Sequence, residues 1–367
     1  MNDSIFSPNY TITPRIEFTL ESIDRNRWLI DNMLLMPKHE AWMRREVRVS
    51  RASGTTRIEG ADLNEEAVGE LTKQALPGAR SEDEQENINA LQAYEFIDFL
   101  SDQEDIPVDE LVMRQLNRYF IATAPPTLTP GAYRKGPNTV GDFQPPGQGD
   151  VPGLMRSFAL WLRDENDEMH LVIKAGLAHL HMVAIHPFWD GNGRTARGLE
   201  TLLLQKSTFG FRKLLSLEST LLNIKDQYFS SLKQTLGTGF NTGYDATPWL
   251  EFSTAALKLC SDLLLEQTTD WHRMMQDARH RWEATGWPQR YVDAYALAVQ
   301  SGRITRSDYV DITGISVATA SRDLAAMVDA GVLTAEGKTR SRVYRPVNLD
   351  AVASNDLPKE QLPLGLG

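Results

Sequence analysis

The residues with the clearest chemical capability form one continuous stretch, His186-Pro187-Phe188-Trp189-Asp190-Gly191-Asn192-Gly193-Arg194-Thr195-Ala196-Arg197. The imidazole of His186 is a natural general base at neutral pH, because its unperturbed pKa is about 6.5. The carboxylate of Asp190 suits Mg²⁺, which favours one or two carboxylates completed by phosphate oxygens and water. The guanidinium groups of Arg194 and Arg197 pair bidentately with phosphate. Together these groups favour a reaction that moves part of a nucleotide.

Two predicted helices position these groups. A helix over residues 170–185 must end near Pro187, because proline cannot continue a helix past its first turn, so His186 lies where the helix gives way to a loop. The run Gly191-Asn192-Gly193 permits positive φ angles and can turn successive N–H groups toward one point. A second helix over about 194–205 then offers its positive N-terminus to phosphate. The two arginines are three residues apart and therefore share one side of that helix.

The stretch resembles the signature of the Fic family, HPFx(D/E)GNGRxxR, and matches all nine positions that the signature specifies. An ordinary helix-loop-helix turn with surface arginines is the alternative, and the coincidence of so many functional groups favours the family. The resemblance implies an all-α core and the transfer of AMP from ATP to a Ser, Thr or Tyr hydroxyl of a target protein. Relatives with altered loops transfer a whole phosphate or phosphocholine, and the intact loop favours AMP.

The resemblance also implies roles for single residues. His186 would deprotonate the target hydroxyl, which attacks the α-phosphate in line, and Asp190 would hold Mg²⁺. The residues that would bind the nucleotide are Gly191, Asn192, Gly193, Arg194, Arg197 and Tyr228. Within this set, Arg197 would bind the γ-phosphate, and the Asn192 side chain would touch phosphate together with the glycine backbone. Tyr228 stands where relatives line the adenine pocket, and a core aromatic is the alternative at that position.

Two further segments are similar to parts of the family. The residues around Pro130-Gly131-Ala132-Tyr133-Arg134 and Asn138-Thr139-Val140-Gly141 resemble its flap, a hairpin of about 131–146 that covers the active site. Thr139 and Val140 would receive a target segment by strand addition, with Val140 as the apolar clamp. A plain surface loop is the alternative. The density of proline and glycine over 124–151 predicts turns, with room for one short hairpin around 136–143.

Upstream, Thr55-Thr56-Arg57-Ile58-Glu59-Gly60 resembles the family's inhibitory motif, (S/T)xxxE(G/N), and implies an inhibitory helix of about 41–60. By this resemblance Glu59 pairs with Arg197 and withholds it from the γ-phosphate, while Thr55 opens the motif. An ordinary helix end with Gly60 just beyond it is the alternative. In some relatives the same glutamate orients water that removes AMP from a modified target, so AMP removal at the same site stays open as the main activity.

Helical patterning dominates the remainder of the chain up to about residue 285. We predict further helices over 14–35, 41–58, 64–74, 81–99, 109–122, 152–163, 218–235 and 249–284. Asn64 and Ser81 stand where helix N-caps are expected. His179 and His181 are two residues apart and face different sides of their helix, so we assign them to helix surface or core and not to a metal site.

From about residue 300 the pattern changes. A short helix from Thr305, a turn at Thr313-Gly314, a helix capped by Ser316 and a hairpin over 332–347 are the layout of a winged helix-turn-helix. Seven basic residues against five acidic ones between 302 and 347 leave this segment at +2 in a chain of −11. DNA contact and docking against protein both stay open.

The composition limits the class of protein. A chain of 367 residues can build a large core in two or more domains. A net charge of −11 argues against broad nonspecific binding to nucleic acid or acidic membranes. We find no signal peptide at the N-terminus and no apolar run near the roughly 18 residues of a membrane span. Cys260 is the only cysteine, which excludes an intrachain disulfide, fits a reducing cytoplasm and predicts a buried thiol.

The expected fold is therefore mainly α, a Fic-type helical core with a β-hairpin flap plus a C-terminal winged helix-turn-helix. The expected segments are an N-terminal helical region (1–105), the Fic core (106–267), a helical connector (268–300), the winged helix-turn-helix (301–348) and a flexible tail (349–367). The expected function is that of a cytoplasmic, self-inhibited adenylyltransferase that uses ATP and Mg²⁺ on an unidentified target protein. The alternatives are AMP removal and a DNA-binding regulator with a secondary Fic activity. The oligomeric state, a homodimer included, stays open.

Overall fold

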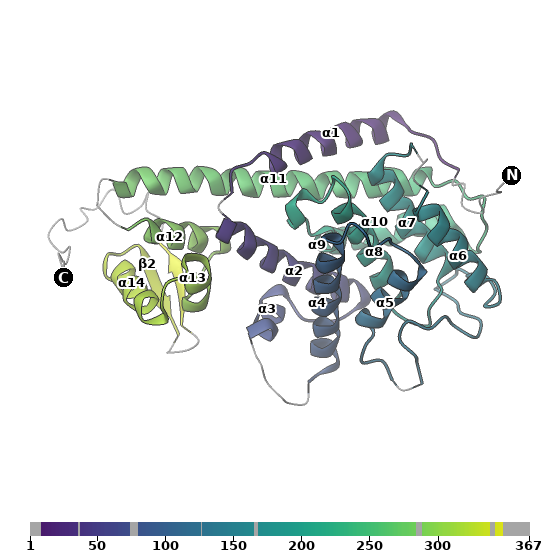
Figure 1. Cartoon of the computed structure of the whole chain (residues 1–367), viewed down its shortest axis with the longest axis horizontal. Helices are drawn as coiled ribbons and strands as arrows, with labels where there is room; N and C mark the ends of the chain where they lie inside the picture. Colours follow the sequence, from purple (N-terminus) through teal and green to yellow (C-terminus); the bar gives the residue numbers. More distant parts are fainter. Residues whose placement is uncertain are drawn as a thin grey trace. The chain divides into compact units, whose positions relative to one another are not determined.

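The computed structural model is mainly helical, which confirms the predicted fold class (Figure 1). It describes residues 9–35, 37–73, 80–125, 127–164, 168–283, 288–337 and 342–347. The chain divides into two compact units: the first comprises Met1–Met33 and Met43–Leu265, and the second comprises Leu34–Trp42 and Glu266–Gly367. The predicted tail over 349–367 and the hairpin tip at 338–340 lie outside the described residues. The domain boundaries inferred from the sequence stay predictions.

The elements up to residue 283 are α1 (Pro14–Asp31), α2 (Pro37–Glu59), α3 (Glu65–Lys73), α4 (Glu82–Ser101), α5 (Glu110–Phe120), α6 (Val151–Leu162), α7 (Leu171–Ile185), α8 (Asn192–Lys206), the 3₁₀ helix η1 (Phe211–Lys213), α9 (Leu217–Asn223), α10 (Lys225–Leu236) and α11 (Thr247–Glu283). Local capping explains several starts. Ser81 accepts a bond from the backbone N–H of Glu84, and the Glu84 carboxylate accepts one from Ser81, which is a capping box. Asn64 accepts a bond from the N–H of Ala67 at 2.9 Å. The predicted single helix over 218–235 is wrong, because the chain breaks at Ile224 (φ −117°, ψ 33°) between α9 and α10.

The core of the first unit is built around α7. Twelve of its fifteen residues are buried, His179 and His181 among them, as expected of a helix that is apolar all round. α8 packs against α7, α4 and α5. A Cβ atom at Gly198 would come within 2.8 Å of the Phe120 ring, so a glycine allows α8 to approach α5 closely. Cys260 is buried as predicted, and burial raises the pKa of its thiol to about 11.

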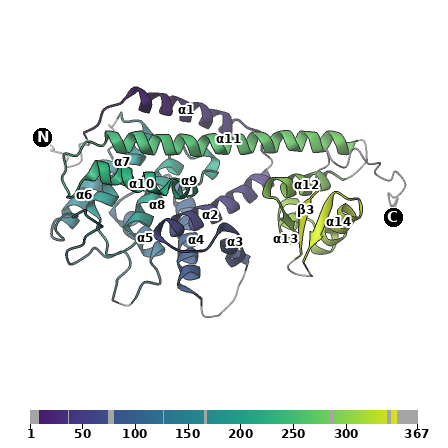
Figure 2. The same ribbon diagram turned by 180° about the vertical axis from the view of Figure 1, so that it is seen from behind.

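A long helix pair closes one side of this unit. In both views α1 lies along the first part of α11 (Figure 1, Figure 2). The two helices are joined by polar side chains at their interface: the Thr19 hydroxyl bonds to that of Thr254 at 3.0 Å, and the Asn26 amide donates to Ser261 at 3.0 Å. None of the described helices combines the length and the apolar composition that a bilayer span requires.

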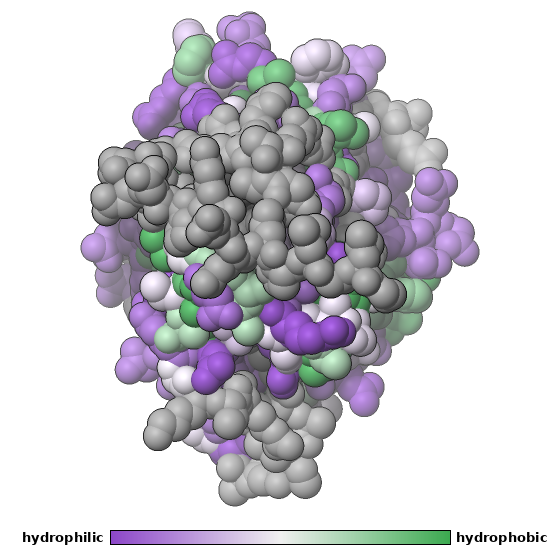
Figure 3. All heavy atoms as spheres, turned by 90° about the vertical axis from the view of Figure 1, so that its left-hand side faces the viewer, coloured by the Kyte–Doolittle hydropathy of each residue, from purple (hydrophilic) through white to green (hydrophobic). Residues whose placement is uncertain are grey.

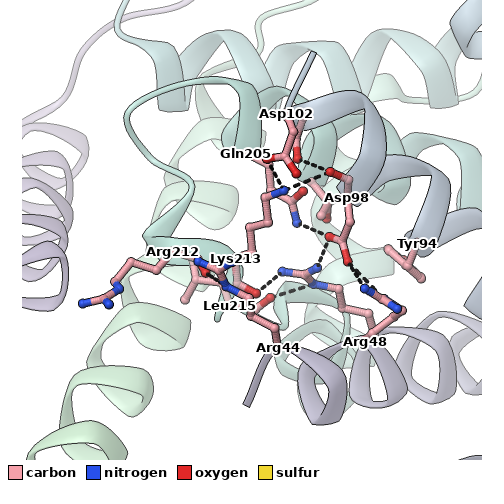
Figure 4. A network of polar contacts seen from close by, with 12 residues as sticks. Arg44, Arg48, Tyr94, Asp98, Asp102, Gln205, Arg212, Lys213 and Leu215 are labelled. Atoms are coloured by element: carbon pink, nitrogen blue, oxygen red, sulfur yellow. Dashed lines mark hydrogen bonds and ion pairs between the residues drawn. The ribbon is translucent and has the colours of Figure 1, made fainter. Parts of the chain in front are cut away.

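α2 is fastened to the core by arginines that follow one another at helical spacing (Figure 4). Arg48 binds Asp98 of α4, with Nη2 and Oδ2 2.8 Å apart. Arg51 is only 2% exposed, donates from Nε to the Leu215 carbonyl at 2.8 Å and lies 3.4 Å from Asp98. Asp98 thus compensates a buried cation and a partly buried one. These contacts orient α2 so that its last turn points toward α8.

The turn at residues 211–213, which hydrogen-bonds to α2, has an unusual backbone. Phe211, Arg212 and Lys213 all have positive φ, at 44°, 56° and 65°, although none is a glycine. Such residues cost on the order of 1–3 kcal/mol each unless their surroundings hold them. Here the carbonyls of Arg212 and Lys213 accept bonds from Arg44 at 2.9 Å and from Arg51 at 3.1 Å. The strained turn and α2 therefore hold each other in place.

The second unit has a small sheet and three further helices: α12 (Gln289–Ser301), β1 (Ile304–Thr305), α13 (Arg306–Thr313), α14 (Val317–Asp329), β2 (Leu333–Glu336) and β3 (Val343–Pro346). The strand order is β1-β3-β2, antiparallel, with Ile304 opposite Tyr344 and Leu333 opposite Pro346. Thr305 and Ser316 cap α13 and α14. The order of helices and hairpin matches the sequence prediction, while β1 was not expected. The assignment as a winged helix-turn-helix stays a prediction.

One buried carboxylate organises this unit. Asp323 of α14 accepts bonds from Arg290 at 2.6 Å, from Tyr309 at 3.0 Å and from Tyr291 at 3.2 Å. These bonds direct Asp323 inward and leave its neighbour Arg322 exposed.

On the side of Figure 1 where these helices are drawn, hydrophilic residues are interspersed with apolar ones over the described surface (Figure 3).

The attachment of α2 can be tested by unfolding. Replacing Asp98→Asn keeps the shape but removes the charge opposite Arg51, and an uncompensated buried cation should cost about 3 kcal/mol of unfolding free energy. Urea denaturation of the parent and the variant measures the difference. Asp142→Asn is the matched control, because its ion pair with Lys233 is exposed on both sides and its loss should leave the midpoint unchanged. Equal midpoints for Asp98→Asn and Asp142→Asn would contradict this account.

Candidate active site

His186 terminates α7 in a left-handed conformation. Its φ and ψ are 47° and 58°, its N–H donates to Met182 at 3.1 Å, and its carbonyl accepts a bond from Arg134 Nε at 2.9 Å. Burial lowers the pKa of the imidazole to about 4, although hydrogen bonding to the Val183 backbone acts in the opposite direction. The ring is therefore neutral at physiological pH and able to accept a proton.

Asn192 closes the loop that follows. Its side-chain oxygen accepts a bond from the Phe188 N–H, and its NH₂ donates to the Phe188 carbonyl, both at 2.9 Å. This differs from the expectation that the Asn192 side chain touches phosphate, because both ends of the amide are used within the loop. Gly191 has a φ of 74°, and a Cβ atom there would come within 2.6 Å of Ile121. These contacts define the path of the loop from residue 188 to 192.

The backbone at the start of α8 remains as the candidate for binding phosphate. The first intrahelical bond is donated by Thr195 to the Gly191 carbonyl at 2.9 Å, so the N–H groups of Asn192, Gly193 and Arg194 precede the helical ladder. Asn117 of α5 supports this turn by donating to the Asp190 carbonyl at 2.9 Å. A rigid set of N–H groups at a helix N-terminus is suited to anions.

Asp190 is the accessible carboxylate of the loop, with its side chain 51% exposed. Its Oδ1 accepts a bond from the Gly191 N–H at 2.6 Å, and Arg194 Nη2 lies 3.1 Å from Oδ2. Within the part of the chain that is described, no group of three or more His, Cys, Asp or Glu side chains converges on a metal position. The donor set fits Mg²⁺, which typically takes one carboxylate and completes its shell with substrate phosphate and water.

Arg197 is buried and paired with the end of α2. Its Nη2 lies 2.5 Å from Glu59 Oε1 and 3.2 Å from the Thr55 carbonyl, and its Nε donates to the Thr55 hydroxyl at 2.9 Å. Burial alone would raise the pKa of Glu59, but the charge and the hydrogen bond of Arg197 outweigh it, so the pKa of Glu59 is lowered. The same pairing raises the pKa of Arg197 against the effect of its burial. Thr55 and Glu59 thus both contact the guanidinium of Arg197.

The Glu59 carboxylate also lies close to the backbone at the start of α8. A Cβ atom at Gly193 would stand 2.6 Å from Glu59 Oε1 and 3.3 Å from Arg197 Nη1. The carboxylate therefore lies directly over the glycine backbone and beside the guanidinium, where a bound phosphate would meet both. Glu59 remains 37% exposed, so this contact borders on solvent.

The second arginine of the loop has an acidic partner that the sequence did not reveal. Arg194 Nη1 lies 3.4 Å from Glu86 of α4, while Nη2 faces Asp190. Burial raises the pKa of Glu86 even though Arg194 opposes this. Glu86 follows the acidic first turn of α4, Glu82-Asp83-Glu84, and nothing in its local sequence distinguishes it from a residue on a solvated helix face.

Tyr228 lies in the core and not at an open pocket. It is 1% exposed, and its hydroxyl lies 3.4 Å from Arg197 Nη1 and 2.9 Å from His179 Nε2. This differs from the expected position at the adenine pocket. The next residue, Phe229, is 44% exposed, and the two rings are 5.0 Å apart. If an aromatic of α10 meets an adenine, Phe229 is the accessible one.

The flap is joined to the loop and ends in an exposed tip. The N–H of Arg134 donates to the Pro187 carbonyl at 2.9 Å. Val140 and Phe143 exchange two backbone bonds of 3.0 Å around Gly141, so the expected hairpin is reduced to one bridge. Thr139 and Val140 are both exposed at this tip, Val140 by 42%. The bonds of Arg134 to the flap and to the loop were not anticipated from the sequence.

Comparison with known proteins agrees with this geometry. A family model described as Fic/DOC family matches residues 107–204. A protein adenylyltransferase Fic of Nematostella vectensis is 28% identical over 260 residues, which are 68% of this chain and 56% of that protein. One of Drosophila ananassae is 30% identical over 261 residues, 69% of this chain and 49% of that protein. This chain thus spans about half the length of these relatives.

The fold has a solved counterpart. The crystal structure of a Fic family protein from Desulfovibrio desulfuricans G20 superposes with a TM-score of 0.60 over 93% of this chain and 98% of that chain, at 21% identity. At this identity the likeness concerns the fold. The region matched by the family model begins before α5 and includes the whole loop from His186 to Arg197. Residues 107–204 of this chain therefore form a Fic/DOC family domain.

Proposed function

We propose that this chain is a self-inhibited protein adenylyltransferase, which transfers AMP from ATP to a Ser, Thr or Tyr hydroxyl of a target protein. The observation that carries the proposal is the 2.5 Å contact of Glu59 with Arg197, directly over the Gly193 backbone. In this proposal the carboxylate of Glu59 takes the place that a phosphate of the nucleotide would take. The matched relatives are named protein adenylyltransferase Fic, which supports AMP as the group transferred.

His186 acts as the general base. Its Nδ1 is buried, so Nε2 is the nitrogen through which the ring accepts the proton of the target hydroxyl. As that O–H bond breaks, the hydroxyl oxygen forms a bond to the α-phosphorus, and the bond from this phosphorus to the bridging oxygen of the β-phosphate breaks. Pyrophosphate leaves with the electron pair, and the proton passes from His186 to solvent. The exposed tip of the flap at Thr139 and Val140 receives the target segment.

The nucleotide is held by charge and by the start of α8. The N–H groups of residues 192–194 surround phosphate oxygens, and the two arginines bind the β- and γ-phosphates. Asp190 would hold Mg²⁺, which supplies charge neutralisation at the phosphates when it is bound. This is catalysis by positioning and by electrostatic stabilisation, in which no residue of the chain becomes covalently modified.

Self-inhibition follows from competition for Arg197. While Glu59 and Thr55 bind the guanidinium, Arg197 is not available to the γ-phosphate. The negative charge of Glu59 also repels that phosphate. ATP then binds in a pose from which the α-phosphate is not attacked. Activation requires that the end of α2 moves away from α8 or that Glu59 turns away from Arg197.

AMP removal is the second candidate activity. It is favoured by the exposure of Glu59, because a carboxylate that borders on solvent and lies beside the phosphate position can orient a water molecule toward a bound AMP group. A target that has been modified by the Glu59→Gly variant provides the substrate for this assay. Contact of the second unit with DNA, homodimer formation and a cytoplasmic location remain predictions from the sequence.

The central variants are Glu59→Gly and His186→Ala. Loss of a charge-assisted bond of about 1.5–3 kcal/mol should raise transfer roughly 10- to 100-fold in Glu59→Gly, since 1.4 kcal/mol corresponds to tenfold. Adding His186→Ala should lower that rate by roughly 10²- to 10⁴-fold. Label transfer from α-³²P-ATP to protein, with Mg²⁺ and a cell lysate as the source of target, measures both. Equal labelling by the parent and Glu59→Gly would remove the case for self-inhibition.

A second variant tests the position of α2 without altering the site. A Cβ atom at Gly54 would stand 2.8 Å from the backbone of Glu218 and Ser219 at the start of α9. Gly54→Ala should therefore push α2 outward and activate transfer several-fold, less than Glu59→Gly, because overpacking typically costs about 1–3 kcal/mol. Gly69→Ala in α3 is the matched control, since a Cβ atom there meets nothing within 4 Å. If Gly54→Ala remains folded by circular dichroism and as inactive as Gly69→Ala, inhibition does not depend on this close approach.

A further inference from the structure

A chain of buried polar side chains runs from Arg197 into the core. Arg197 Nη1 lies 3.4 Å from the Tyr228 hydroxyl, which lies 2.9 Å from His179 Nε2. His179 Nδ1 in turn lies 2.6 Å from Glu200 Oε2. The four residues come from α8, α10 and α7, and each is at most 4% exposed. Buried polar groups in such a line are costly unless every member is bonded, and here each link is made.

The chemistry of these groups determines which of them donates and which accepts at each hydrogen bond. A glutamate carboxylate accepts hydrogen bonds, so we assign the proton of His179 to Nδ1. A neutral imidazole then accepts at Nε2, and the Tyr228 hydroxyl donates to it. The remaining lone pairs of the hydroxyl face Arg197, which only donates. Burial raises the pKa of Tyr228 to about 12, although the charge of Arg197 opposes this, so the hydroxyl keeps its proton.

The partners of Arg197 fall into two sets. Thr55 and Glu59 belong to α2, and their contacts are lost when α2 releases the guanidinium. Tyr228 belongs to α10, and its contact does not depend on α2. A long arginine side chain with no fixed partner would occupy several rotamers and pay ordering entropy when it binds phosphate. Of the partners named here, Tyr228 is the one that would remain beside Arg197 after release.

We infer that Tyr228, His179 and Glu200 form a tether that holds the Arg197 guanidinium in the nucleotide site after α2 has released it, an inference that rests on the proposed function. The three are positioning residues, since they act through Arg197 and touch neither nucleotide nor target. Their effect on the order of the Arg197 side chain is not measurable in the parent, where Thr55 and Glu59 hold the same guanidinium. It becomes measurable when Glu59 is removed.

The same helix provides a matched control. His181 lies two residues along α7 and bonds through Nδ1 to the Tyr244 hydroxyl, so it is another buried histidine-tyrosine pair. Residues two apart on a helix face different directions, and this pair points away from the His179 side. Tyr244→Phe removes a bond of the same kind from the same unit.

The experiment compares Glu59→Gly alone, with Tyr228→Phe and with Tyr244→Phe. The direct readout is the side-chain order of Arg197, from ¹⁵N relaxation of its Nε–H group in protein labelled at arginine. We expect Arg197 to be ordered in Glu59→Gly and in the Tyr244→Phe double variant, and mobile in the Tyr228→Phe double variant. The second readout is transfer, for which Tyr228→Phe should lower kcat/KM for ATP roughly tenfold, and Tyr244→Phe less than twofold.

The two readouts separate the inference from the function on which it rests. Equal order of Arg197 in all three proteins, or the same kcat/KM for ATP with and without Tyr228→Phe, overturns the tether. Loss of order in the Tyr228→Phe double variant without transfer in any protein supports the tether and contradicts the proposed transferase. A His179 ring found protonated at Nε2 and not at Nδ1 by ¹⁵N NMR would also overturn it, because the direction of the chain would be reversed.

Discussion

The positive charge of Arg197 is buried, and the organisation of the site follows from that constraint. A buried guanidinium is stable only when a counter-charge and acceptors surround it. Glu59 supplies the charge at 2.5 Å, and Thr55 and Tyr228 supply oxygen acceptors. In the structure this counter-charge comes from α2. In the function proposed above, a nucleotide phosphate would supply it instead, and the same guanidinium would become part of the catalytic site.

The proposed inhibition therefore depends on the part of α2 that lies within the first unit and not on one ion pair alone. Near its middle the helix is fastened by Arg48 and Arg51 to Asp98. Further along, Gly54 allows the helix to touch the start of α9. These contacts aim the last turn, and with it Glu59, at α8. Release of Arg197 can thus occur by a small displacement of the end of the helix, while its other attachments persist.

Much of this arrangement could be predicted from the sequence because it is local. The loop from His186 to Arg197 is continuous, so the types and order of its groups are visible without a fold. Helix starts at Asn64 and Ser81 follow from capping chemistry. The pairing of Glu59 with Arg197 spans 138 residues and came only from the resemblance to a family. Its alternative, an ordinary helix end, was equally consistent with the residues alone.

The remainder depends on packing that no local pattern records. Asn192 and Tyr228 have the residue types expected of ligand contacts, but the fold uses the first to close the loop and buries the second. Glu86 meets Arg194 only because α4 packs against α8. The left-handed turn at residues 211–213 contains no glycine, which is the usual signal for such a backbone. Each of these became visible only once the helices were assembled.

The most direct test of the central claim is the affinity for ATP relative to ADP, measured by calorimetry with Mg²⁺ for the parent and for Glu59→Gly. The third phosphate is the group that Arg197 would hold. If Glu59 withholds Arg197, the parent should bind ATP and ADP about equally, and Glu59→Gly should bind ATP roughly tenfold more tightly than ADP, as one charge-assisted bond allows. An equal preference for ATP in the two proteins would contradict the claim that Glu59 and the nucleotide compete for Arg197.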